Sequence, residues 1–361
     1  MERVDVAIVG GGVVGLAAAW RLASAGRDVV VLEQFDVGHA NGSSHGSTRI
    51  FRFAYDDPAY VRLAQAALPL WRELESVAGR DLLRITGGID VGDDPYLEAC
   101  ASALEVCGAR VERLSAEACR DRFNWLRAGD EAAVFSPDTG VLAADDVVRS
   151  LAESASRMGA RIEAGSRCEG FDVHAGSVEI RSGEKTISAR RCIVSAGAWG
   201  SELLSPLGVR LPVRVTREQV FYFSGGVEML PFIHRGPIPR YGVPRSGSAA
   251  GYKVAEHGTG ATTTAADRTF DLDPSGAVRL TEYVQASLPA LDPQPLAAET
   301  CLYTMTPDEG FVLDARGPII IASACSGHGF KFAPVVGEIL AALATDSKPP
   351  VPLDPFSLAR F

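Results

Sequence analysis

Apolar residues in the first 33 positions follow the pattern of a strand, a turn, a helix and a second strand. Residues 4–9 form a β-branched apolar run, and residues 16–25 repeat apolar side chains at helical spacing. Residues 29–32 form a second short apolar run. Glycines fill the turn between the first run and the helix, at residues 10–15. This order predicts a parallel βαβ unit, the first unit of an α/β sheet.

The same patterns predict further helices and strands along the chain. Helices are expected over residues 58–77, 97–106, 116–123, 144–158 and 335–343. Strands are expected over residues 84–91, 177–181, 186–188, 191–194, 211–223, 252–257, 299–305 and 319–322. Pro69 should kink the helix that contains it. We predict an α/β fold, α+β overall, with a Rossmann-like dinucleotide domain of residues 1–85, 140–215 and 300–361. A second, substrate domain of residues 86–139 and 216–299 is expected on a mixed or antiparallel sheet.

The glycine turn matches the G-x-G-x-x-G fingerprint of dinucleotide-binding folds. Gly10 permits the tight turn, Gly12 lets the backbone approach a pyrophosphate, and Gly15 lets the helix pack closely on the strand. Glu33 follows Gly15 by 18 residues, where it can accept hydrogen bonds from ribose hydroxyl groups. A plain glycine-rich turn is the alternative, and the fingerprint does not separate NAD from FAD. The distant segment 191–199, an apolar strand running into small residues, favours a discontinuous FAD domain.

Composition and charge exclude several classes of protein. The chain has 361 residues, of which 47% are hydrophobic and 22% charged, as in folded globular proteins of about two domains. A net charge of −10 disfavours binding to nucleic acid or to an anionic membrane. Seven cysteines without a C-x-x-C pair argue against disulfides and a metal site. The apolar run 6–20 is broken by glycines, unlike a secretory signal, and no stretch has the roughly 18 apolar residues of a membrane span. We expect a cytoplasmic protein.

Two segments combine cations with small residues in a way that suits anionic ligands. Residues 43–52 place Arg49 and Arg52 three positions apart, after serines and glycine that can contact phosphate and flavin. A surface cationic pair is the alternative. Residues 325–332 lie between a strand and a helix, so their amides can stabilise negative charge on a flavin. Lys331 lies between two phenylalanines and is expected to be buried, whereas His328 fits a structural role equally well.

The chain resembles the monomeric sarcosine oxidase and N-methyltryptophan oxidase branch of the D-amino-acid-oxidase-like flavoproteins. The resemblance rests on S-S-H-G-S-T-R from residue 43, C-L-Y-T from residue 301 with P-D-E from 307, and S-G-H-G-F-K-F from 326. These motifs span nearly the whole chain. By itself, Cys301 would be interpreted as a small buried hydrophobe. The resemblance implies that it carries FAD through a thioether to the 8α-methyl group.

The resemblance also assigns roles to the remaining candidate residues. Arg52 and Lys331 match the pair that binds the substrate carboxylate, and Arg49 matches an arginine that lies over the flavin. Lys253 matches the lysine that activates oxygen near flavin N5. The substrate pocket is expected to include His257, Tyr241 and Tyr303. The predicted cofactor contacts are Gly10, Gly12, Gly15, Glu33, Ser43, Ser44, Thr48, Cys301, Gly327, Gly329 and Lys331. Two departures from the family pattern, Cys168 near the adenine and Phe53 after Arg52, favour a substrate bulkier than sarcosine.

The implied function is oxidation of an N-methyl or cyclic amino acid. FAD would take a hydride from the carbon next to nitrogen, water would hydrolyse the imine, and oxygen would become hydrogen peroxide. The partners would then be a small amino acid and oxygen, and the enzyme a monomer. One alternative is a biosynthetic imine-forming enzyme acting on a ring or carrier-bound amino acid. Others are a dehydrogenase that passes electrons to a protein and a flavin carrier without catalysis.

Overall fold

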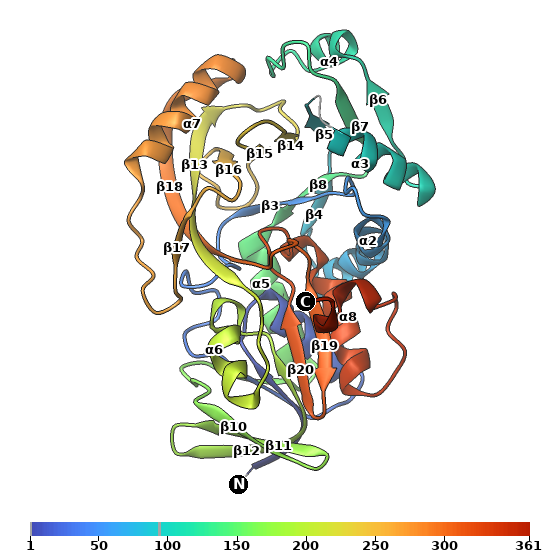
Figure 1. Cartoon of the computed structure of the whole chain (residues 1–361), viewed down its shortest axis with the longest axis vertical. Coiled ribbons are helices and arrows are strands. Elements are labelled where there is room, and N and C mark those ends of the chain that lie inside the picture. Colours follow the sequence, from blue (N-terminus) through green and yellow to red (C-terminus); the bar gives the residue numbers. More distant parts are fainter. Residues whose placement is uncertain (1, 93–94) are drawn as a thin grey trace.

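The computed structural model describes residues 2–92 and 95–361. Figure 1 shows two large sheets towards opposite ends of the long axis, with a small sheet between them. The first sheet has eight strands in the order β10-β11-β12-β1-β2-β9, and β20 and β19 continue it beside β12. These strands are β1 (Glu2–Val9), β2 (Val29–Leu32), β9 (Arg161–Glu163), β10 (Gly170–His174), β11 (Ser177–Ser182), β12 (Lys185–Val194), β19 (Val312–Arg316) and β20 (Ile319–Ser323). The strands β20, β12, β1, β2 and β9 are parallel, as in a Rossmann-like sheet.

The second sheet has nine strands in the order β17-β13-β16-β15-β14-β5-β7-β6, and β18 pairs with β13. They are β5 (Gly88–Val91), β6 (Glu112–Leu114), β7 (Ala133–Ser136), β13 (Arg214–Gly225), β14 (Phe232–His234), β15 (Arg240–Val243), β16 (Tyr252–Glu256), β17 (Ala261–Thr263) and β18 (Leu291–Met305). The pair β14 and β5 is parallel and the other pairs are antiparallel. The predicted fold class, an α/β molecule with a second mixed sheet, is confirmed.

A three-stranded sheet joins the two large ones, in the order β3 (Thr48–Phe51), β8 (Gly140–Ala143) and β4 (Leu83–Ile85). Figure 1 shows it between the two large sheets. The described helices are α1 (Val13–Ser24), α2 (Pro58–Ala78), α3 (Pro95–Val106), α4 (Ala116–Arg122), α5 (Ala144–Arg157), α6 (Gly200–Leu204), α7 (Pro274–Ser287) and α8 (Ala333–Ala344). α1 packs against both α5 and α8, and α7 packs along β18.

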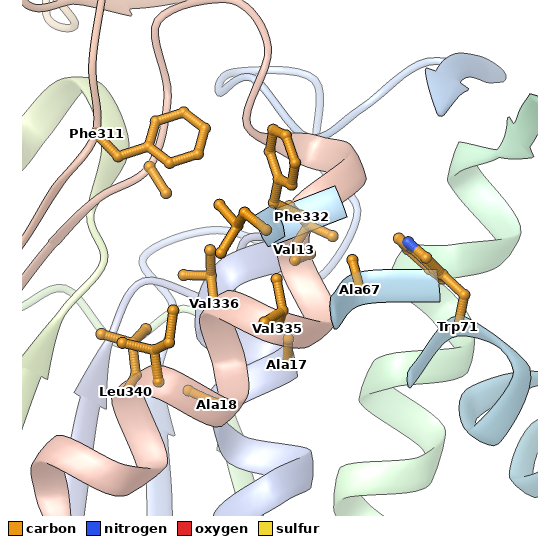
Figure 2. Packing of buried hydrophobic residues seen from close by; sticks show 14 of the residues in the cluster. Val13, Ala17, Ala18, Ala67, Trp71, Phe311, Phe332, Val335, Val336 and Leu340 are labelled. Atoms are coloured by element: carbon orange, nitrogen blue, oxygen red, sulfur yellow. The ribbon is translucent and has the colours of Figure 1, made fainter. Parts of the chain in front are cut away.

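Close packing of α8 on α1 fixes the segment that ends in Lys331. Figure 2 shows Val335, Val336 and Leu340 of α8 in one buried cluster with Ala17 and Ala18 of α1. Gly337 allows this approach, because a Cβ there would lie 2.6 Å from the backbone of Ala17. Trp71 of α2 is fully buried, and its indole nitrogen donates to the backbone carbonyl of Lys331 at 2.8 Å. The position of Lys331 is therefore fixed by the packing of α8, which follows it, and by the hydrogen bond from Trp71.

Several predicted elements differ from the observed ones. The strand expected over 84–91 is two strands, β4 and β5, which belong to different sheets because Gly87 turns the chain with φ +75°. The strands expected over 186–188 and 191–194 are one strand, β12. The helix α2 continues through Pro69 to Ala78. Sequence reasoning missed α7 and the first half of β18.

Candidate active site

One pocket extends from the glycine turn after β1 to the second sheet. It is lined by most of the predicted site residues: Gly10, Gly12, Glu33, Ser43, Ser44, Arg49, Arg52, Tyr241, Lys253, His257, Cys301, Tyr303, Gly327, Gly329 and Lys331. Gly15 and Thr48 do not line it. A Cβ on Gly15 would lie 2.0 Å from the carbonyl oxygen of Gly10, so this glycine serves helix packing. The Thr48 side chain donates to the carbonyl of Pro244 at 3.2 Å, and Thr48 stays a predicted cofactor contact.

The glycine turn leaves room for a ligand at the start of α1. Gly10 has φ +105°, a left-handed conformation that favours glycine. A Cβ on Gly12 would lie 3.1 Å from the hydroxyl oxygen of Ser44. That hydroxyl accepts a hydrogen bond from the backbone N–H of Val13 at 3.0 Å. The loop that begins at residue 43 is thus fastened to the first turn of α1, where backbone N–H groups favour an anion.

Glu33, at the end of β2, is a buried acceptor facing the same turn. Its carboxylate accepts from the backbone N–H of Gly11 at 2.7 Å and of Phe35 at 2.9 Å. Burial raises the pKa of Glu33, but hydrogen bonds from His39, Phe35 and Gly11 outweigh it and lower the pKa overall. The side chain is therefore an ionised acceptor held in one position, as ribose recognition requires.

Arg49 organises the loop between the turn and β3. Its guanidinium donates to the carbonyls of Thr48 at 3.0 Å, Ser43 at 3.1 Å and His45 at 2.5 Å, and lies 5.3 Å from the centre of the Phe330 ring. Nε2 of His45 is buried in the pocket wall and has no hydrogen-bond partner among residues 2–92 and 95–361. Burial, with the charge of Arg49, lowers the pKa of His45 to about 3. The imidazole is therefore neutral.

Two of the four lysines in the chain are buried, and both line the pocket. Nζ of Lys253 donates to the carbonyl of Thr48, and Nζ of Lys331 donates to the hydroxyl of Tyr55 at 3.0 Å and the carbonyl of His328 at 2.8 Å. Burial lowers the pKa of both lysines well below the usual value, and the neighbouring arginines add to this effect. Their hydrogen-bond partners among the described residues are neutral oxygens, so both ammonium groups add positive charge to the pocket when protonated.

Arg52 has an internal partner that the sequence did not indicate. Its Nη1 donates to Oδ1 of Asp90 at 3.0 Å and to the carbonyl of Ala54 at 2.5 Å, and its guanidinium carbon lies 4.3 Å from the centre of the Tyr55 ring. Asp90 is 4% exposed and lies in the middle of β5. The sequence feature that could have revealed this partner is the single carboxylate, Asp90, within the otherwise apolar run 88–91.

The far end of the pocket contains the predicted substrate-binding tyrosines and histidine. Burial raises the pKa of Tyr241 and Tyr303, so both remain phenols. The ring of Tyr303 lies 5.5 Å from that of His257, and Nε2 of His257 lies 3.9 Å from a carboxylate oxygen of Glu309. Cys301 lines the same region as a free thiol, and burial raises its pKa while the charge of Arg49 opposes the rise.

The structure also shows where Phe53, Cys168 and His328 lie relative to the pocket. Phe53 is buried in the core, 5.4 Å from the Phe51 ring, and does not line the pocket, so it gives no support for a bulkier substrate. Cys168 does line the pocket. His328 is a pocket-lining residue with both ring nitrogens engaged: Nδ1 lies 3.2 Å from the hydroxyl of Tyr55 and Nε2 lies 2.9 Å from the carbonyl of Glu309.

Comparison with known proteins shows the family of this chain. A family model described as FAD dependent oxidoreductase matches residues 5–343. The chain belongs to the FAD-dependent oxidoreductase family. The chain is 33% identical to the peroxisomal sarcosine oxidase of Homo sapiens, over 99% of this chain and 96% of that protein. It is 32% identical to the monomeric sarcosine oxidase of Bacillus sp. (strain NS-129) and 30% identical to the N-methyl-L-tryptophan oxidase of Yersinia pestis (strain Pestoides F), again over 99% of this chain and over 96% and 99% of those proteins. These matches confirm the predicted resemblance.

Among solved structures of this family, the open form of NikD has a TM-score of 0.88 and 26% identity, covering 99% of this chain and 98% of that one. NikD is described as an unusual amino acid oxidase essential for nikkomycin biosynthesis. The residues present here fit FAD. The open cradle at Gly12, the ionised acceptor Glu33 and the unpartnered nitrogen of His45 all border one pocket. The protein is therefore an FAD-dependent oxidoreductase.

Within the described residues, no group of three or more His, Cys, Asp or Glu side chains could hold a metal ion. None of the described helices is both long enough and apolar enough to span a membrane.

Proposed function

We propose that this flavoprotein oxidises a secondary amino acid, N-methylated or cyclic, at the carbon next to the nitrogen. The observation that carries the proposal is the pair Arg52 and Lys331, two largely buried cations that line the same pocket as the glycine turn. A guanidinium fork and an ammonium group together suit a carboxylate. Bound FAD supplies the acceptor for the hydride.

The chain's own residues would orient the substrate and exclude water. Arg52 and Lys331 would hold the carboxylate, and His257 would accept a hydrogen bond from the neutral amine. Tyr241 and Tyr303 are buried phenols that would enclose the reacting carbon. Lys253 would stabilise the negative charge that develops when oxygen is reduced to hydrogen peroxide.

We propose further that Cys301 carries the flavin covalently. Support comes from its place in the pocket wall and from the nearby charges of Arg49 and Lys253, which partly oppose the rise of its pKa that burial causes. After acid precipitation, the yellow colour should stay with the wild-type protein and be released from Cys301→Ala. The matched control is Cys325→Ala, another partly buried cysteine that lines the pocket, which should keep the colour. Colour lost from the wild type would refute the covalent link while leaving the oxidase proposal intact.

A biosynthetic role on a ring amino acid is a second candidate, and the likeness to NikD over 99% of the chain favours it. One experiment tests both candidates: hydrogen peroxide release with sarcosine, N-methyl-L-tryptophan, L-proline and L-pipecolate, using Lys331→Met as the control. We expect at least one of these substrates to be oxidised by the wild type and to lose most of its turnover in the control. Flavin reduction without peroxide would indicate a dehydrogenase, and no reduction by any substrate would contradict the proposal.

We also propose that the enzyme is a cytoplasmic monomer whose cofactor domain comprises residues 1–85, 140–215 and 300–361 and whose substrate domain comprises residues 86–139 and 216–299. The name of the Bacillus relative, a monomeric enzyme, supports the oligomeric state. Size-exclusion chromatography with light scattering tests it, and a dimer mass would contradict it.

A further inference from the structure

We propose that Asp90 is a positioning residue that fixes Arg52 for the substrate carboxylate. This inference rests on the proposed function, because it assumes that Arg52 binds a carboxylate. It adds a residue that neither the sequence motifs nor the resemblance assigns.

The placement of Asp90 is costly unless Arg52 is its partner. All four residues of β5 are buried, and the Asp90 side chain is 6% exposed. An unpaired carboxylate in such a strand would lose several kcal/mol of hydration free energy. The observed contact, Nη1 of Arg52 to Oδ1 of Asp90 at 3.0 Å, is a charge-assisted hydrogen bond that compensates for this loss. The buried strand therefore constrains where the guanidinium can lie.

The hydrogen bonds that Arg52 makes to the described residues all come from one nitrogen of its guanidinium. Its hydrogen bonds to Asp90 and to the carbonyl of Ala54 both come from Nη1, and the Tyr55 ring covers one face. The edge formed by Nε and Nη2 is the one left for a planar anion. The hydroxyl of Tyr55 also accepts from Lys331, so one tyrosine sets the spacing of the two cations.

Asp90 also connects this cation pair to the wall of the substrate pocket. It lies opposite Ile233 in the pairing of β5 with β14, and Ile233 lines the pocket. Arg52 follows β3, which belongs to the three-stranded sheet. The ion pair thus joins two sheets and holds Arg52 in a fixed place relative to the pocket wall. Its charge also balances that of Arg52 and leaves Lys331 to attract one carboxylate.

Two substitutions separate position from charge. Asp90→Asn keeps an oxygen that can accept from Arg52 but removes the negative charge. Asp90→Leu removes both the acceptor oxygen and the negative charge. The probe is acetate, titrated into the FAD-loaded enzyme and followed by the flavin absorption spectrum. We expect Asp90→Leu to weaken acetate binding by at least tenfold and to raise KM for the amino acid substrate similarly. Asp90→Asn should bind acetate within threefold of the wild type or more tightly. If Asp90→Leu does not yield folded protein, Asp90→Ala takes its place with the same expectations.

A substrate without a carboxylate distinguishes positioning from a general structural role. Turnover of an N-methyl amine that lacks a carboxylate should differ by less than threefold between Asp90→Leu and the wild type. An equal loss for both substrates would overturn the inference, as would acetate binding by Asp90→Leu that matches the wild type. If Arg52→Met binds acetate like the wild type, the carboxylate site of the proposed function fails instead, and the inference fails with it.

Discussion

Replacing Lys253 with methionine should slow the reaction of the reduced enzyme with oxygen while leaving substrate oxidation nearly unchanged. Lys253 is 3% exposed, and its ammonium group donates to the carbonyl of Thr48 and has the charge of Arg49 nearby. It lies on β16, between β13 and β15, and lines the pocket. A fixed positive charge at that place stabilises the anion that forms when oxygen takes an electron, and it stabilises neutral oxygen much less.

The expected size follows from the burial of this charge. Two unit charges about 5 Å apart, in surroundings of effective dielectric constant about 20, attract each other by about 3 kcal/mol. A barrier change of that size corresponds to roughly a hundredfold in rate. Because burial lowers the pKa of Lys253, its effect should decline as pH rises through that lowered pKa, below the usual lysine range.

Stopped-flow spectroscopy separates the two half-reactions. Anaerobic mixing with substrate measures flavin reduction, and mixing the reduced enzyme with oxygenated buffer measures reoxidation. Lys253→Met should reduce at a rate within about threefold of the wild type and reoxidise roughly a hundredfold more slowly. The control is Lys185→Met, an exposed lysine paired with Glu163, which should alter neither rate. Equal reoxidation in Lys253→Met and wild type would refute the reasoning and make Arg49 the next residue to test.

Three further predictions concern the cation and packing around the site. Acetate affinity should fall as pH rises through the lowered pKa of Lys331, because only the ammonium form attracts the anion, and titrations of Lys331→Met should be weak and independent of pH over this range. Trp71→Phe leaves the carbonyl of Lys331 without its 2.8 Å donor and should lower the unfolding free energy by about 1–3 kcal/mol in urea, with wild-type stability contradicting the contact. Gly337→Ala places a methyl group 2.6 Å from the backbone of Ala17 and should cost about 1–3 kcal/mol by the same assay. Gly276→Ala, whose methyl group would first meet the end of a flexible side chain, should cost less, and equal costs would refute the packing argument.

Local patterns predicted the parts of this fold that depend on near neighbours. The βαβ unit of residues 1–33 was predicted because each strand and the helix carry their own hydrophobic period. The helix α7 was missed because its apolar stripe is short, with Leu280, Tyr283 and Val284 as its buried larger side chains. Its start signal was present: Asp273 caps the helix and Pro274 occupies its first turn.

Pairing between distant segments explains what could not be predicted about the site. Arg52 follows β3 of the three-stranded sheet and Asp90 lies 38 residues later in β5 of the nine-stranded sheet, so no local period links them. Lys253 is buried because the strands on both sides of it come from elsewhere in the chain, which no local pattern shows. The pocket positions of Cys301 and Lys331 were expected from motif resemblance rather than from physical periodicity.

The pocket is built from residues that lie far apart in the chain, and this determines when it can form during translation. Glu33 and Lys331 border the same pocket, yet about 300 residues separate them in the chain. At roughly 5–20 residues per second, a ribosome takes on the order of 15–60 s to cover that interval. Throughout it, the small-residue face of α1 lacks α8, its later packing partner, and remains exposed to water or to chaperones. FAD can therefore bind a complete site only after translation has passed Lys331, so cofactor binding comes late in the synthesis of each molecule.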